Sequence, residues 1–262
     1  MKVIKRAVLT GAVLKLIQSR RRIKQGIGSN ASCADSVERA NHDGVGRYVD
    51  GFASAGRKEA LTLPPEYERL KQSLPTDLGI PKEAVPYGMR TPDASGLLIM
   101  YPVSETISMP FDNDQWIIDQ MHEHMGENEG LIEVKSGITA KGHPYVHEII
   151  KHRFEVEDGI PMVEYTININ VKLDKTIQFI NGSFKEEGTT GVRDSTALHF
   201  FSSANDMSLE EVLEIWWEDP YDSEYKKGFL MNMSEQEKLD ELFPTHALSE
   251  ARKLLKYIVE NN

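Results

Sequence analysis

The sequence holds a single cysteine, Cys33, among its 262 residues. One cysteine excludes an intrachain disulfide and any metal site built from several thiolates, which fits a reducing cytoplasm. Long apolar runs are missing near the start as well. The run Ala7–Leu14 is much shorter than the roughly 20 residues that a membrane-spanning helix needs. Residues 1–25 are therefore expected to form a plain helix or a frayed arm, and the alternatives are a basic helix that contacts a membrane surface or a partner, and a leader or anchor.

Basic residues are scarce outside that first segment. The net charge is −11, yet the first 30 residues carry eight Lys and Arg and no acid, which leaves 22 basic against 41 acidic residues in the rest. So acidic a body repels the phosphates of nucleic acids. We therefore expect no nucleic-acid partner, and we expect the partners to be proteins or small molecules.

Recognisable catalytic and metal-binding motifs are missing too. The stretch His147–His152 resembles the HExxH motif of zinc proteases, but its histidines lie five residues apart and would face opposite sides of a strand. Gly188–Gly191 lacks the spacing of a nucleotide-binding loop, and Ser195 lacks the flanking glycines of a nucleophile elbow. The sequence therefore gives no catalytic residue, and we expect no metal and no cofactor.

The clearest positive signal is a run of three strands over residues 145–185. Apolar and polar residues alternate between Met162 and Lys172, which predicts a strand with one buried face and one wet face. Asp158-Gly159 suits a tight hairpin turn before this strand, and residues 172–175 suit a second reversal after it. These signals predict an α+β protein with an antiparallel sheet meander packed against helices.

Strand, turn and cap signals divide the rest of the chain. Residues 1–59 read as a basic helical arm and a flexible linker, residues 60–203 as the α+β domain, and residues 204–262 as an acidic helical extension packed on that domain. Two further strands are expected over 87–91 and 97–103, with a turn at 93–96, and another over 131–139. Helices are expected after Pro64-Pro65, after caps at Asp112, Asp194, Ser208 and Ser234, and over 248–259.

Four polar residues are candidates for a small-ligand site at the edge of the sheet. Glu148 and His152 share one face of the first meander strand, where structural pairing or simple exposure is the alternative to an acid–base role. Arg193 and Asp194 follow a Gly-rich turn, where backbone N–H groups could cradle an anion. The alternative there is a plain turn with Asp194 as the helix N-cap.

Two adjacent tryptophans, Trp216 and Trp217, are candidates for partner binding. One helix cannot bury both on a single narrow stripe, so one of them is expected in a groove or on a contact surface. They lie in residues 204–250, which carry 13 acidic and three basic side chains.

The phrases FDNDQWIIDQM, GHPYVHEIIKH and TIQFINGSFKEEGTTGVRD, in this order within residues 87–203, give the chain a pattern that resembles the Mog/PsbP-like α/β sandwich superfamily. The resemblance implies a non-enzymatic protein, since members bind a small GTPase, assist photosystem assembly or act as chaperones of secreted bacterial effectors. We therefore expect a cytoplasmic protein-binding module, such as a secretion-associated adaptor or chaperone. The alternative is a small-ligand-binding protein or a hydrolase with its site at the sheet edge.

Overall fold

The computed structural model describes residues 61–71, 74, 80–104, 109–154, 161–174 and 176–262. The elements below belong to one compact unit formed by Leu61–Ser73 and Glu83–Asn262. The predicted arm and linker over residues 1–59 and the predicted Asp158-Gly159 turn lie outside the described residues.

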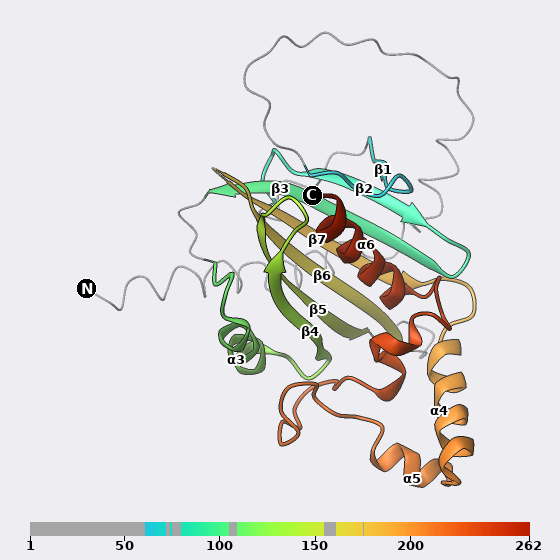
Figure 1. Cartoon of the computed structure of the whole chain (residues 1–262). Helices are drawn as coiled ribbons and strands as arrows, with labels where there is room; N and C mark the ends of the chain where they lie inside the picture. Colours follow the sequence, from blue (N-terminus) through green and yellow to red (C-terminus); the bar gives the residue numbers. More distant parts are fainter. Residues whose placement is uncertain (1–60, 72–73, 75–79, 105–108, 155–160, 175) are drawn as a thin grey trace, which may run out of the picture. The chain divides into compact units, whose positions relative to one another are not determined.

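A seven-stranded sheet in which every neighbouring pair is antiparallel forms the centre of this unit (Figure 1). The predicted three-strand meander is confirmed as β5, β6 and β7, which are neighbours in the sheet. The spatial order is β1-β2-β3-β7-β6-β5-β4, so the chain places its last strand in the middle. The strands are β1 (Glu68–Arg69), β2 (Val85–Arg90), β3 (Ala94–Ser104), β4 (Glu129–Ile138), β5 (Pro144–Phe154), β6 (Met162–Lys172) and β7 (Thr176–Glu186).

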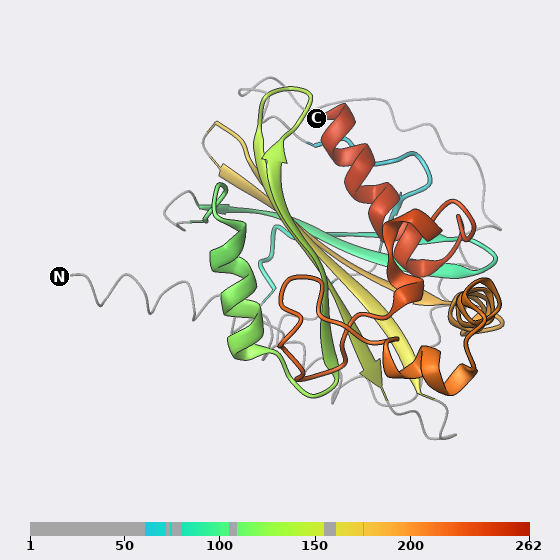
Figure 2. The same cartoon turned by 60° about the horizontal axis from the view of Figure 1, so that its bottom comes forward.

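Four α-helices accompany the sheet in the described part of the chain, which makes the fold α+β as expected. The long C-terminal helix α6 crosses one face of the sheet over β3, β6 and β7, and α3 packs against the edge strand β4 (Figure 1). Helices α4 and α5 lie beside that face (Figure 2). The helices are α3 (Asp114–His124), α4 (Val192–Asn205), α5 (Leu209–Glu214) and α6 (Ala247–Asn261), with short 3-10 turns η2 (Met233–Glu235) and η3 (Glu237–Leu239).

The main core lies between α6 and the sheet. Cross-strand register aligns Ile149 with Ile167 and places both on the face that α6 covers, where neither is exposed. Helix α6 presents an apolar stripe at helical spacing to this face, including Leu248, Ala251 and Ile258, as the sequence predicted. Burying such side chains contributes about 1.5–3 kcal/mol each, so this interface is a large part of the stability.

The opposite face of the sheet departs from the prediction that it is wet. Thr166, Asn168 and Asn170 alternate with the core residues of β6, as expected, but each of the three is buried. Asn168 donates to Glu148 on β5 over 2.7 Å and accepts from Asn181 on β7 over 2.6 Å. These hydrogen bonds satisfy polar groups across three strands, so alternation in the sequence revealed polarity and not exposure.

Several predicted caps are displaced in the structure. Asn113, and not Asp112, accepts the N-cap hydrogen bond of α3. Gly191, with φ 73°, precedes α4, so Asp194 lies inside the first turn and is not the cap. The Ser208–Glu211 capping box of α5 is confirmed.

Three other local predictions are wrong. The predicted box at Ser234 gives way to one between Asn232 and Glu235, which starts only a 3-10 turn. Pro64-Pro65 leads through a turn into β1 and not into a helix. The predicted turn at 93–96 is shorter, because β3 already begins at Ala94 and pairs with β2 and β7 from there.

Candidate functional site

The four predicted ligand-site residues do not converge on one pocket. Glu148 and His152 occupy even positions of β5, on the face opposite α6, where Glu148 binds Asn168 and His152 Nδ1 lies 3.4 Å from Glu129. Arg193 and Asp194 belong to α4 and contact residues 232–240 beside the other face. The sheet therefore separates the first pair from the second.

The two tryptophans divide between the core and the surface. The chain leaves α5 at Glu214, so neither tryptophan is helical, contrary to the predicted helix through both. An extended stretch pairs with residues 231–233, and Trp217 forms an antiparallel bridge with Asn232. Extended backbone points successive side chains in opposite directions. Trp216 is consequently buried at 3% exposure, whereas Trp217 stays 39% exposed.

A buried ion pair joins the sheet to the segment that holds Trp217. Lys151 Nζ on β5 lies 2.8 Å from Glu235 Oε2, and both side chains are almost wholly buried. Tyr165 on β6 donates to the other carboxylate oxygen over 3.0 Å. The ammonium also lies 4.0 Å from the ring centre of Phe229 and 4.9 Å from that of Trp217. Burial lowers the pKa of Lys151, while Glu235 opposes that effect.

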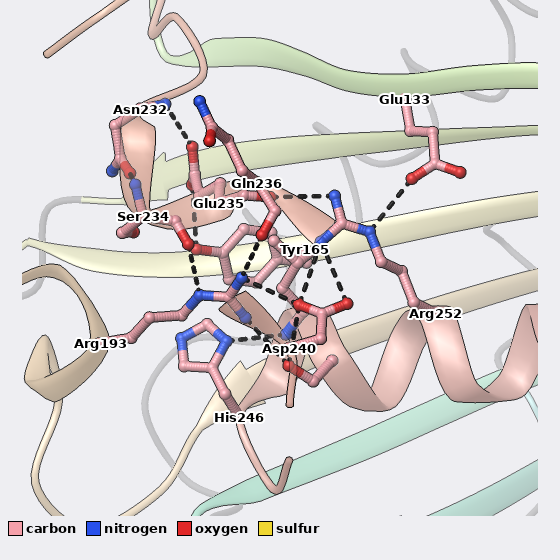
Figure 3. Close-up of polar contacts among 12 residues, drawn as sticks. Glu133, Tyr165, Arg193, Asn232, Ser234, Glu235, Gln236, Asp240, His246 and Arg252 are labelled. Atoms are coloured by element: carbon pink, nitrogen blue, oxygen red, sulfur yellow. Dashed lines mark hydrogen bonds and ion pairs between the residues drawn. The ribbon is translucent and has the colours of Figure 1, made fainter. Parts of the chain in front are cut away.

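Two arginines from different helices hold the backbone just beyond this pair (Figure 3). Arg193 of α4 donates to the carbonyls of Ser234 and Gln236 over 2.7 and 3.2 Å, and Arg252 of α6 donates to that of Glu235 over 3.0 Å. Three successive carbonyls outside regular α-helix are thereby satisfied, as buried backbone requires.

Asp240 lies between the two guanidinium groups and balances their charge (Figure 3). Its Oδ1 is 2.9 Å from Arg193 Nη2 and 3.1 Å from Arg252 Nη1. Arg252 reaches in addition to Glu133 of β4 over 3.1 Å. The chain of contacts therefore runs from α4 through residues 234–240 to α6 and the edge strand.

Glu133 is the last residue in this series of contacts, and it binds a buried histidine. Its second oxygen lies 2.9 Å from His147 Nε2, and His147 is wholly buried. Burial alone would raise the pKa of Glu133, but the hydrogen bonds and electrostatic attraction from His147 and Arg252 outweigh it and lower the pKa to about 2. Glu133 is therefore ionised at neutral pH and serves as an acceptor.

The contacts from Lys151 to Glu133 fix residues 231–240 against the sheet, and sequence reasoning missed them. One signal was available, because Lys151 falls in the same alternating row as Tyr145 and Ile149. A lysine within the apolar row of a strand indicates a buried acidic partner. Its partner lies 84 residues away along the chain, which no local pattern can identify.

The same segment forms one wall of an open hollow of about 470 Å³. Its lining combines buried Trp216 with side chains that are exposed at the rim, among them Ile215, Tyr221 and Glu218. The full lining is Ile215, Trp216, Glu218, Asp219, Pro220, Tyr221, Asp222, Ser223, Met231, Asn232, Met233 and Gln236.

Residues 219–229 anchor the far side of the hollow to α3 and β4. The Tyr221 hydroxyl accepts from the Val134 N–H over 2.5 Å and donates to the Val134 carbonyl over 3.1 Å. Tyr221 thus occupies both backbone groups with which an edge strand could pair with another chain. Asp219 binds His122 of α3 over 3.0 Å.

A surface of exposed apolar and acidic side chains adjoins the hollow, and we name it the α5 surface. Its four large apolar side chains are exposed to solvent: Leu209 is 49% exposed, Leu213 46%, Ile215 52% and Trp217 39%. Glu210, Glu214 and Glu218 are exposed between them. An apolar patch rimmed by polar groups is typical of a site that binds another molecule.

The comparisons with known proteins assign no relative. No protein-family model matches the sequence, and no curated protein matches it either. Within the described ranges, no three His, Cys, Asp or Glu side chains gather as a metal site would require. No helix in the same ranges has the length and apolar content to cross a bilayer. A functional assignment therefore has to rest on the geometry above.

Proposed function

We propose that this protein is a binding module for another protein and that it catalyses no reaction of its own. The α5 surface carries the proposal. Four large apolar side chains within nine residues, Leu209 to Trp217, remain open to solvent, and Ile215 among them also lines the hollow. Exposed apolar area has an unfavourable hydration free energy, and contact with a partner removes it.

The Lys151–Glu235 pair supports this proposal because it fixes the backbone next to the Trp217 end of the α5 surface. Residues 231–235 fix the extended stretch that bears Trp217, through the bridge to Asn232 and the hydrogen bond from Met233 N to the Trp216 carbonyl. A surface that is already ordered loses little conformational entropy when it binds. The buried polar contacts thus prepare the α5 surface for a partner.

As a more specific proposal, the chain is a Mog/PsbP-like adaptor or chaperone that works in the cytoplasm of a bacterium. An antiparallel sheet with helices packed on it is the architecture that the resemblance implies, which supports the proposal at the level of fold class. Residues 1–59 would then be a helical extension, and their basic charge would add a weak contact with an anionic membrane surface.

A capture experiment with matched surface variants tests the binding function. The tagged full chain is incubated with lysate of the source cells, beside a Leu213→Asp/Ile215→Asp variant and a Leu242→Asp/Ile138→Asp control. The control residues are also open, at 70% and 61% exposure, but lie outside the α5 surface. We expect one stoichiometric partner that the wild type and the control retain and the α5-surface variant loses. No stoichiometric partner with any of the three chains would contradict the function.

A further inference from the structure

The charge of the α5 surface identifies the kind of partner that it fits, and this inference rests on the proposed function. From Asp194 to Tyr225 the chain has nine acidic residues and neither lysine nor arginine. Among the described residues, Glu210, Glu214 and Glu218 form no salt bridge. The negative charge there is not neutralised from within the described part of the protein.

Repulsion between two of these carboxylates destabilises helix α5. Glu210 and Glu214 are four residues apart on a helix of six residues, so their carboxylates lie on the same side of it. Like charges at this spacing destabilise a helix by about 0.2–0.5 kcal/mol. A cation bound between them would turn this repulsion into attraction.

Apolar side chains lie at the same spacing on the same short helix. Leu209 and Leu213 are four residues apart and both are about half exposed, and Ile215 continues from them into the wall of the hollow. Acidic and apolar groups are therefore interleaved over residues 209–218. A ligand complementary to this surface must interleave basic and apolar groups in the same way.

We propose that the α5 surface binds a basic amphipathic peptide segment of the partner, in which Lys or Arg alternate with aliphatic residues. The aliphatic side chains cover Leu209, Leu213 and Ile215, and the cations meet Glu210, Glu214 and Glu218. Nucleic acids and anionic lipid surfaces are repelled by the same carboxylates. An acidic peptide is repelled for the same reason, so the sign of the partner's charge is the distinguishing feature.

Three synthetic peptides of 18 residues, titrated into the full-length protein by fluorescence anisotropy, test this proposal. One combines Leu with Lys and Arg in an amphipathic helical pattern, the second replaces its basic residues by Glu, and the third replaces its Leu by Ser. We expect the first peptide to bind at least about tenfold more tightly than either of the others, and more weakly as salt is added.

Two charge variants locate the binding. Glu210→Gln/Glu214→Gln/Glu218→Gln should weaken binding of the basic amphipathic peptide at least about tenfold. Glu66→Gln/Asp174→Asn/Glu260→Gln removes the same charge from exposed positions outside the α5 surface and should change binding less than about twofold. Equal weakening by both variants would mean attraction to net charge alone and would overturn the proposal.

The outcomes separate this inference from the function on which it rests. If the natural partner is lost with Leu213→Asp/Ile215→Asp but none of the peptides binds, the surface binds a protein of another chemistry and the inference fails alone. If the acidic peptide binds best, the inference fails as well. If no partner is captured and no peptide binds, both proposals fail.

Discussion

Lys151 and Glu235 form a buried ion pair between β5, the neighbour of the edge strand β4, and a segment 84 residues further along the chain. The Glu235 carboxylate also accepts hydrogen bonds from the Tyr165 hydroxyl and the Asn232 N–H, and these bonds stabilise its charge in the buried site. The pair therefore positions residues 231–235, and through them the exposed Trp217. It joins the fold to the α5 surface.

Removing one charge of this pair should cost more than removing both. Glu235→Gln leaves the Lys151 ammonium buried without its counter-ion, which we expect to lower the free energy of unfolding by about 3 kcal/mol. Lys151→Met/Glu235→Gln should recover about 1 kcal/mol or more of that loss, because no lone charge remains. Urea unfolding of the wild type and the variants measures both values, and a double variant less stable than Glu235→Gln would contradict the account.

Glu133 should make stability depend on pH in the acidic range. Its pKa is about 2 in the folded protein against an ordinary value of 4.5. Because the folded value is the lower one, the contribution is fully present above pH 4.5 and is lost as the pH falls toward 2. We expect Glu133→Gln to be about 2 kcal/mol less stable than the wild type at pH 7, and this difference to shrink below pH 4.5.

Unfolding free energies of the wild type and Glu133→Gln across pH 3–7 measure this difference. Glu260→Gln, at an exposed position on α6, is the control and should follow the wild type at every pH. A Glu133→Gln deficit that stays constant down to pH 3 would show that the carboxylate titrates normally in the fold.

Tyr221 should protect the edge of the sheet. Tyr221→Phe removes the hydroxyl that binds both backbone groups of buried Val134, so we expect a loss of about 1–2 kcal/mol and a tendency to self-associate. Thermal unfolding and light scattering measure the two effects. Tyr257→Phe, whose hydroxyl makes no hydrogen bond within the described residues, should leave both unchanged.

Gly130 of β4 leaves room for the chain that leads to the hollow. A Cβ atom there would lie 1.7 Å from the Phe229 carbonyl oxygen, whereas the nearest atom to one at Gly88 of β2 would belong to the flexible Leu70 side chain, at 3.2 Å. We expect Gly130→Ala to cost about 3 kcal/mol or more and Gly88→Ala less than about 1 kcal/mol, measured by thermal unfolding. Equal stability of the two variants would show that residues 228–230 do not lie against β4.

The strands were predictable because their signal is local. Alternation from Met162 to Lys172 and the polar breaks between strands give β5, β6 and β7 without knowledge of the rest of the chain. The same pattern misjudged the face with Thr166 and Asn168, since a polar residue can be buried when neighbouring strands supply hydrogen-bond partners, as they do for Asn168.

The candidate site was less predictable because its contacts are remote in sequence. Arg193 was selected as a ligand-binding residue for its place after a Gly-rich turn, but its guanidinium is occupied by Asp240 and by the carbonyls of Ser234 and Gln236. Trp216 and Trp217 were selected on the expectation of one helix through both, but the backbone there is extended and points the two side chains in opposite directions. Which of the two is exposed depends on the extended backbone that follows α5.

The central claim is that the α5 surface binds a protein partner, and the dissociation constant of that partner tests it most directly. Isothermal titration calorimetry with the captured partner should give an affinity at least about tenfold weaker for Leu213→Asp/Ile215→Asp than for the wild type. Leu242→Asp/Ile138→Asp should bind within about twofold of the wild type, since apolar residues outside an interface contribute little. Equal affinities for all three chains would contradict the claim.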